Sequence, residues 1–109
     1  MKQFEIWIAD LNPQKGTEPG KVRPVVIIQT DLLNGEHPST IICPVTTNVI
    51  DDAEILRVHL RKDQLPHKSD VLVDQVRAID NKRFVKRVSK LNSQQIVKMK
   101  ENLRIVMDL

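Results

Sequence analysis

The chain has a single cysteine, Cys43, and among its 109 residues there are no tyrosines, one tryptophan and two phenylalanines. One cysteine cannot form a disulfide within the chain, so we expect a protein of the reducing cytoplasm. Cys43 lies in the apolar run IICPV, where a buried hydrophobic role is more usual than a nucleophilic one. The aromatic content of 3% argues against the aromatic platforms on which many single-strand-binding modules stack bases.

Long hydrophobic runs are also missing. No apolar stretch approaches the roughly 20 residues that span a bilayer. The first residues, MKQFEIWIADL, have neither the apolar core nor the cleavage site of a signal peptide. Repeats, low-complexity segments and linkers are absent too. The length and a hydrophobic content of 40% therefore predict one domain over residues 1–109, with a core of Val, Ile and Leu.

Motifs for metals and nucleotide cofactors are lacking. The histidines, His37, His59 and His67, show no HxxxH spacing, and a single cysteine argues against structural zinc. Asp51 and Asp52 fit a solvated turn better than a magnesium site, which usually includes substrate phosphate. There is no Walker loop or dinucleotide fingerprint, so we expect no metal and no cofactor. A nuclease with two converging histidines stays open as an alternative, although nothing in the sequence brings a pair together.

The net charge is +3 and the pI is about 9.2. This balance leans mildly toward anionic partners such as RNA, DNA or an acidic protein segment. It falls far short of a histone-like excess, so charge alone does not separate a functional basic surface from a solvated one.

Apolar alternation predicts a succession of short strands. They are expected at residues 5–10, 23–30, 40–49, 56–60 and 83–91, and residues 70–80 form either two strands or one bent strand. In the strand at 56–60, Leu56, Val58 and Leu60 share one face, and Arg57 and His59 form the polar face.

A helix should follow the strands. Asn92 can cap its first turn, with Gln95 three residues later completing a capping box. Residues Ile96, Met99, Leu103 and Val106 repeat at helical spacing. Several strands followed by one helix predict a mainly-β fold, a small antiparallel barrel-like sheet with a C-terminal amphipathic helix.

The loop at residues 16–24, GTEPGKVRP, is the strongest candidate for chemistry. Arg23 precedes Pro24, which favours an extended backbone and fixes the guanidinium at the start of a strand. A guanidinium there suits a phosphate, Thr46 could offer its hydroxyl if the two strands are neighbours, and Glu18 could act as a base. The alternative is that Glu18 and Arg23 form a loop salt bridge of little consequence.

Three blocks then carry a resemblance. EIWIADLNPQKGTEPGKVRPVVIIQ, IICPVTTN and VLVDQVRAID, in this order and spacing, resemble the signature blocks of the MazF/PemK (Kid) toxins and cover nearly the whole chain. The resemblance implies an SH3-like β-barrel, a homodimer and a sequence-selective endoribonuclease held inactive by an antitoxin with a flexible acidic segment. Two positions depart from the family pattern: Phe4 stands where a glycine is usual, and Pro19 where glutamine is frequent.

The resemblance also implies roles for individual residues. The family's active-site arginine corresponds to Arg23 and its threonine to Thr46, and some members implicate the acidic loop residue, here Glu18. Contacts to RNA are expected from six further polar residues of the blocks, Lys15, Thr17, Lys21, Thr47, Gln75 and Arg77.

The implied reaction is metal-independent transesterification, in which the ribose 2′-hydroxyl attacks the adjacent phosphorus and leaves a 2′,3′-cyclic phosphate. Two other functions stay open on the same fold. One is a non-catalytic toxin that binds DNA gyrase, like CcdB, and the other is an RNA-binding module without cleavage.

Overall fold

The computed structural model describes residues 1–12, 16–17 and 21–109. Within these residues the chain forms seven strands, two short 3-10 turns and one α-helix. The elements are β1 (Glu5–Asp10), β2 (Val22–Ile27), β3 (Ser39–Thr46), β4 (Arg57–Leu60), β5 (Ser69–Leu72), η1 (Val73–Gln75), β6 (Arg77–Asp80), η2 (Asn81–Arg83), β7 (Phe84–Lys90) and α1 (Ser93–Met107).

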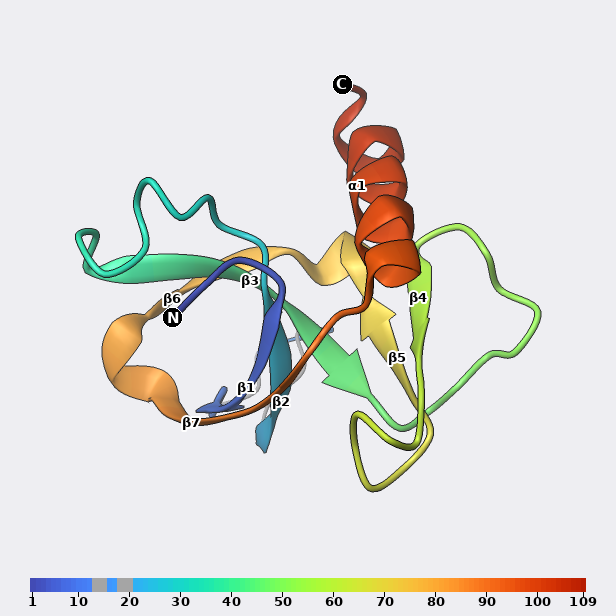
Figure 1. Cartoon of the computed structure of the whole chain (residues 1–109), viewed down its shortest axis with the longest axis horizontal. Helices are drawn as coiled ribbons and strands as arrows, with labels where there is room; N and C mark the ends of the chain where they lie inside the picture. Colours follow the sequence, from blue (N-terminus) through green and yellow to red (C-terminus); the bar gives the residue numbers. More distant parts are fainter. Residues whose placement is uncertain (13–15, 18–20) are drawn as a thin grey trace.

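The strands form one curled antiparallel sheet with the order β4-β5-β3-β2-β1-β7, and β6 also pairs with β3 (Figure 1). The start of β3 pairs with β6, whereas its end pairs with β5. The segment at 70–80 is therefore two strands separated by η1, the first of the two alternatives. The curled sheet with one terminal helix confirms the predicted mainly-β class.

Burial along β2 explains how the sheet holds two core clusters. Val25, Val26 and Ile27 are fully buried, and successive strand residues point to opposite faces. Val26 accordingly packs in one cluster with Cys43, whereas Val25 and Ile27 pack in the other with Leu11. Burial raises the pKa of the Cys43 thiol to about 12, so this cysteine is a core residue and not a nucleophile.

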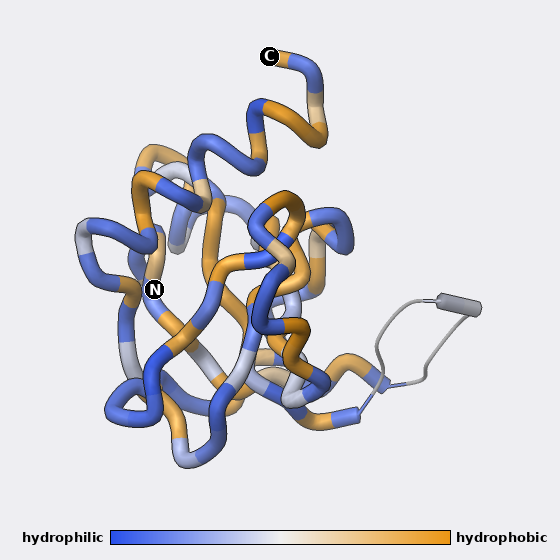
Figure 2. Tube along the Cα trace, turned by 90° about the vertical axis from the view of Figure 1, so that its right-hand side faces the viewer, coloured by the Kyte–Doolittle hydropathy of each residue, from blue (hydrophilic) through white to orange (hydrophobic). Residues whose placement is uncertain are grey.

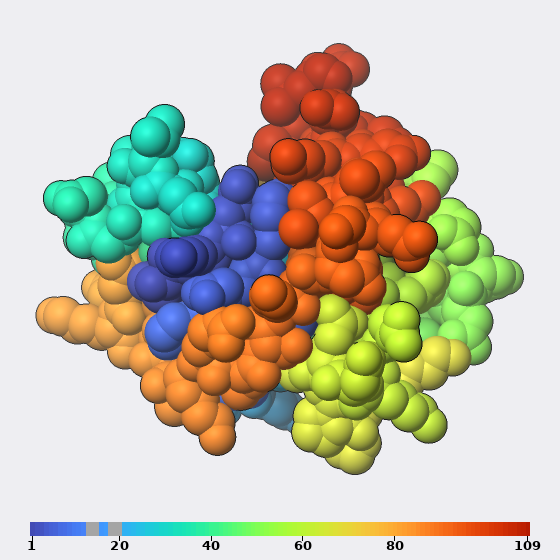
Figure 3. Space-filling model, viewed as in Figure 1, coloured from blue at the N-terminus to red at the C-terminus, as the bar shows by residue number. Residues whose placement is uncertain are grey.

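The helix α1 covers the first cluster. The Asn92 side chain accepts from the Gln95 backbone N–H, and the Gln95 side chain accepts from the Asn92 N–H, which is the predicted capping box. Met99 is fully buried, and blue and orange segments alternate along α1 in Figure 2, as expected for an amphipathic helix. In Figure 3 the helix lies beside the N-terminal residues and above the β4–β5 connection. Among the described residues, no helix has the length and apolarity needed to cross a membrane.

One residue at the entry to β1 has an unusual backbone. Phe4 has φ 68°, a left-handed conformation that costs an L-residue about 1–2 kcal/mol. Its N–H donates to the Ile27 carbonyl and its carbonyl accepts from Leu91 N–H, so both neighbours fix this conformation. The side chain is 9% exposed, and Lys100 Nζ lies 5.8 Å from the ring centroid. Position 4 thus combines a left-handed backbone, which glycine adopts readily, with a buried apolar side chain.

We expect Phe4→Gly and Phe4→Ala both to destabilise the protein, because removing a buried phenylalanine costs about 3–5 kcal/mol. Glycine usually makes a protein less stable than alanine does at the same position, and here we expect the opposite order of stability. Alanine keeps the left-handed strain and glycine relieves it, so Phe4→Gly should be the more stable by about 1 kcal/mol. Urea unfolding measures both free energies. A more stable Phe4→Ala would contradict the role assigned to the backbone.

Candidate functional site

Arg23 and Thr46 line one pocket at the ends of adjacent strands. The pairing of β2 with β3 aligns Val25 with Pro44, and Arg23 Nη1 donates to the Val45 carbonyl at 3.4 Å. The condition set for Thr46, that the two strands are neighbours, is therefore met. The cavity measures about 290 Å³, and we call it the Arg23 pocket; its lining residues are Lys21, Val22, Arg23, Pro24, Val45, Thr46, Thr47 and Ser69.

The strand beneath this pocket fixes the arginine backbone. Arg23 lies within β2 and pairs with Ala9 of β1, which agrees with the extended conformation expected before Pro24. The backbone of Lys21, two residues before Arg23, is also fixed. Its N–H donates to Asn12 Oδ1 at 2.8 Å, and its carbonyl accepts from the Leu11 N–H. Two cationic residues thus line the pocket on a backbone that hydrogen bonds to neighbouring residues hold in place.

Thr46 ends β3, opposite Asp70 of β5. Its hydroxyl oxygen accepts a hydrogen bond from the Asn48 N–H at 3.1 Å. A hydroxyl has one hydrogen to donate and two lone pairs to accept with. This contact uses a lone pair, so the hydroxyl hydrogen can be donated to a phosphate oxygen in the pocket.

The other sequence-predicted site residues divide between two places. Lys21 and Thr47 line the Arg23 pocket. Thr17 and Gln75 instead line a second pocket of about 380 Å³, together with Asp74, which the sequence analysis did not single out. Arg77 is half-buried on β6 and belongs to neither lining.

Two predicted residues, Glu18 and Lys15, lie outside the described residues. The sequence analysis also missed Ser69, which lines the Arg23 pocket and donates its hydroxyl to the His67 carbonyl at 2.8 Å. In the sequence Ser69 stands between a charged connector and a strand, and no motif there indicates that it lies near Thr46.

An apolar groove adjoins the Arg23 pocket and shares three of its residues. The groove measures about 470 Å³ and is mainly apolar, and we call it the apolar groove; it is lined by Ile8, Pro24, Thr47, Gln64, Leu65, Pro66, His67, Ser69, Lys86 and Val88. A ligand with both an anionic and an apolar part could therefore occupy the two cavities at once.

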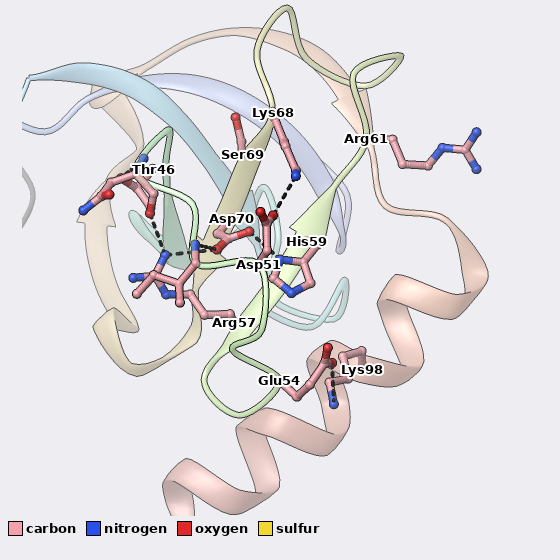
Figure 4. Close-up of polar contacts among 12 residues, drawn as sticks. Thr46, Asp51, Glu54, Arg57, His59, Arg61, Lys68, Ser69, Asp70 and Lys98 are labelled. Atoms are coloured by element: carbon pink, nitrogen blue, oxygen red, sulfur yellow. Dashed lines mark hydrogen bonds and ion pairs between the residues drawn. The ribbon is translucent and has the colours of Figure 1, made fainter.

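The predicted polar face of β4 does not simply face solvent. Asp70 is fully buried, and Arg57 and His59 both turn toward its carboxylate, at 3.1 Å and 2.6 Å (Figure 4). The polar face of β4 therefore carries the two side chains that pair with a buried carboxylate.

Asp51 is exposed and pairs with Lys68 at 2.6 Å, a contact that lowers the pKa of the Asp51 carboxyl. In the part of the chain that the structure describes, no group of three or more His, Cys, Asp or Glu residues could hold a metal ion.

Comparison with known proteins places this geometry in a family. Residues 2–107 match the PemK-like, MazF-like toxin of type II toxin–antitoxin systems. The chain is 32% identical over 112 residues to a Staphylococcus epidermidis protein named endoribonuclease MazF, covering all of this chain and 92% of the relative.

Solved structures agree on the fold. MazF from Deinococcus radiodurans superposes with a TM-score of 0.87 at 20% identity, covering 100% of this chain and 97% of that one. The Mycobacterium tuberculosis toxin MazF-mt6 superposes with a TM-score of 0.81 at 24% identity, covering 96% and 97% of the two chains. The resemblance carried by the three sequence blocks is thereby confirmed, and this chain belongs to the PemK-like, MazF-like toxins of type II toxin–antitoxin systems.

Proposed function

We propose that this MazF-like toxin endoribonuclease cuts single-stranded RNA, and mRNA in the cell, at selected sequences and so stops translation until an antitoxin neutralises it. One observation carries the proposal. A guanidinium and a hydroxyl, from Arg23 and Thr46, line the same pocket at the ends of two paired strands. Donors held in place before the reaction are what stabilisation of a charged transition state requires.

In the proposed reaction the ribose 2′-oxygen forms a bond to the adjacent phosphorus, and the bond from phosphorus to the 5′-oxygen breaks. Glu18 takes the proton of the 2′-hydroxyl, and the departing 5′-oxygen takes a proton from solvent water to become a hydroxyl. Arg23 stabilises the extra negative charge, because a guanidinium keeps its protons and is a poor base. Thr46 donates to a non-bridging oxygen. The nucleophile belongs to the substrate, so the reaction needs no metal-bound water.

The remaining predicted residues would bind RNA on either side of the cut. Lys21 and Thr47 line the Arg23 pocket, and Thr17 and Gln75 line the second pocket. Lys15 and Arg77 complete the proposed set of RNA contacts. We further propose that the chain acts as one domain over residues 1–109, as a homodimer, in the cytoplasm where mRNA is found.

The deciding experiment for this function incubates the purified protein with a long single-stranded RNA in excess chelator. Cleavage at a few sequences supports the proposal. A shift of the RNA band without cutting would favour the RNA-binding module, and gyrase inhibition without any effect on RNA would favour the CcdB-like toxin. For variants that remove the charge of Arg23, the control is Arg104→Ala, which removes an exposed arginine of α1 outside both pockets.

The proposed partner is an antitoxin that fills the same surface as RNA. Structural relatives have been solved as a mycobacterial endoribonuclease with its cognate antitoxin and as MazE–MazF of Deinococcus radiodurans. In this chain the cationic Arg23 pocket adjoins the apolar groove. An acidic segment with apolar anchors could occupy both cavities, and its charges would speed association.

We therefore expect the antitoxin to compete with RNA, and both affinities to fall as salt rises, because both ligands use the same positive groups. The measurement titrates labelled RNA against the antitoxin on the Thr46→Val protein, which keeps both cations and lacks the hydroxyl. Simultaneous binding without mutual weakening would show that the antitoxin binds elsewhere, for instance on α1.

A further inference from the structure

Asp70 is a fully buried carboxylate beside the candidate site. It lies on β5, with Thr46 opposite on β3 and His59 opposite on β4. A buried charge is tolerated only when it is paired and hydrogen-bonded. Here the carboxylate has three partners: Arg57 Nη1 at 3.1 Å, the Ile50 N–H at 3.1 Å and His59 Nδ1 at 2.6 Å.

These contacts hold the segment that follows Thr46. Arg57 Nη1 donates to the Asn48 carbonyl at 2.9 Å as well as to Asp70. The same residue, Asn48, donates its N–H to the Thr46 hydroxyl oxygen. The segment from 48 to 50 is thus attached to Asp70 at both ends, once through Arg57 and once through the Ile50 N–H.

The backbone of Arg57 and His59, the two residues that pair with Asp70, is hydrogen-bonded to the helix α1. Asn102 of α1, which is 1% exposed, donates to the Arg57 carbonyl at 3.0 Å, and Gln95 donates to the His59 carbonyl at 3.0 Å. The strand that carries Arg57 and His59 is therefore fixed to the helix on the side away from Asp70. A rigid base is what allows one side chain to orient another.

We propose that Asp70 is a positioning residue for the reaction: with Arg57 it holds the Asn48 N–H against the Thr46 hydroxyl oxygen and so directs the hydroxyl hydrogen into the Arg23 pocket. The inference rests on the proposed function. Asp70 itself does not line the Arg23 pocket, so it acts on the reaction only through Thr46.

The test measures kcat and KM for RNA cleavage by Asp70→Asn, which keeps the size of the side chain and removes its charge. We expect kcat to fall about 10- to 100-fold, the scale of a small misplacement, with KM changed less than about 2-fold because the cations remain. Arg57→Gln is the second variant, and its kcat should fall in the same direction. The parent Arg57 side chain is 16% exposed and lines the second pocket, so KM is compared with the parent only for Asp70→Asn. Asp51→Asn, which removes an exposed carboxylate paired with Lys68, is the matched control and should cleave at the parent rate.

A double-mutant cycle separates positioning from general weakening. In a Thr46→Val protein the hydroxyl is gone, so adding Asp70→Asn should lower kcat by less than about 2-fold further. Full additivity would overturn the proposal, as would parent-level kcat in a folded Asp70→Asn. Unfolding of both Asp70→Asn and Arg57→Gln would also overturn it, because the pair would then serve the fold. A wild-type protein that cleaves no RNA would refute the proposed function itself, a result distinct from all of these.

Discussion

Arg23→Ala should slow RNA cleavage by about 100-fold or more, the scale seen when a preorganised donor to a charged transition state is removed. The backbone of Arg23 pairs with Ala9 of β1, which fixes the start of the side chain. Its Nη1 donates to the Val45 carbonyl, which orients the guanidinium. A solvent molecule that replaces it would have to reorganise around the developing charge. Single-turnover rates on a short RNA measure the effect without the contribution of product release.

The effect should be specific to charge and geometry at this position. Arg23→Lys keeps a cation without the planar fork, so it should fall between the parent and Arg23→Ala. Arg104→Ala should match the parent rate, and the melting temperature of each variant shows whether it is folded. An Arg23→Ala protein that is folded and cleaves at the parent rate would place the active site elsewhere.

A substrate with a single 2′-deoxyribose on the 5′ side of the cut should not be cleaved at that position. The 2′-oxygen is the proposed nucleophile, and without it no bond to phosphorus can form. The remaining ribonucleotides keep the binding surface, so the modified RNA should still compete with unmodified RNA for the protein. Gel analysis of the paired substrates measures both properties.

Moving the 2′-deoxy position supplies the control. A deoxyribose one nucleotide further in either direction should leave cleavage largely intact, because the attacking hydroxyl is restored. Efficient cutting of the RNA that lacks the adjacent 2′-hydroxyl would require a nucleophile other than the substrate and would exclude the mechanism.

Local patterns predicted the fold well where one face of a strand or helix is buried. The strand at residues 5–10 and the cap at Asn92 agree with the structure, because alternation and capping depend on neighbouring residues alone. The bend between β5 and β6 could not be decided in advance. Both strands pair with β3, whose paired residues lie 24–26 positions earlier in the chain for β5 and 35–41 positions earlier for β6.

The candidate site shows the same division. Arg23 and Thr46 were brought together by the family resemblance and, from the residues alone, only on the condition that their strands are neighbours. The antiparallel pairing of β2 with β3 meets that condition. Asp70 was missed because it directly follows a charged connector in the sequence, where an aspartate is usually exposed. Its burial follows from Arg57 and His59, which come from another strand. Their alternation in β4 was visible in the sequence as a polar face, but only the fold shows what that face covers.

The chemistry at the new 5′ end tests the central claim most directly. RNA is cut by the wild-type protein in excess chelator, and the downstream fragment is offered to polynucleotide kinase and labelled phosphate without prior phosphatase treatment. Attack by the 2′-oxygen expels the 5′-oxygen, so the account predicts a 5′-hydroxyl that accepts the label at once. A fragment that takes up label only after phosphatase treatment carries a 5′-phosphate, and that result would contradict transesterification at the Arg23 pocket.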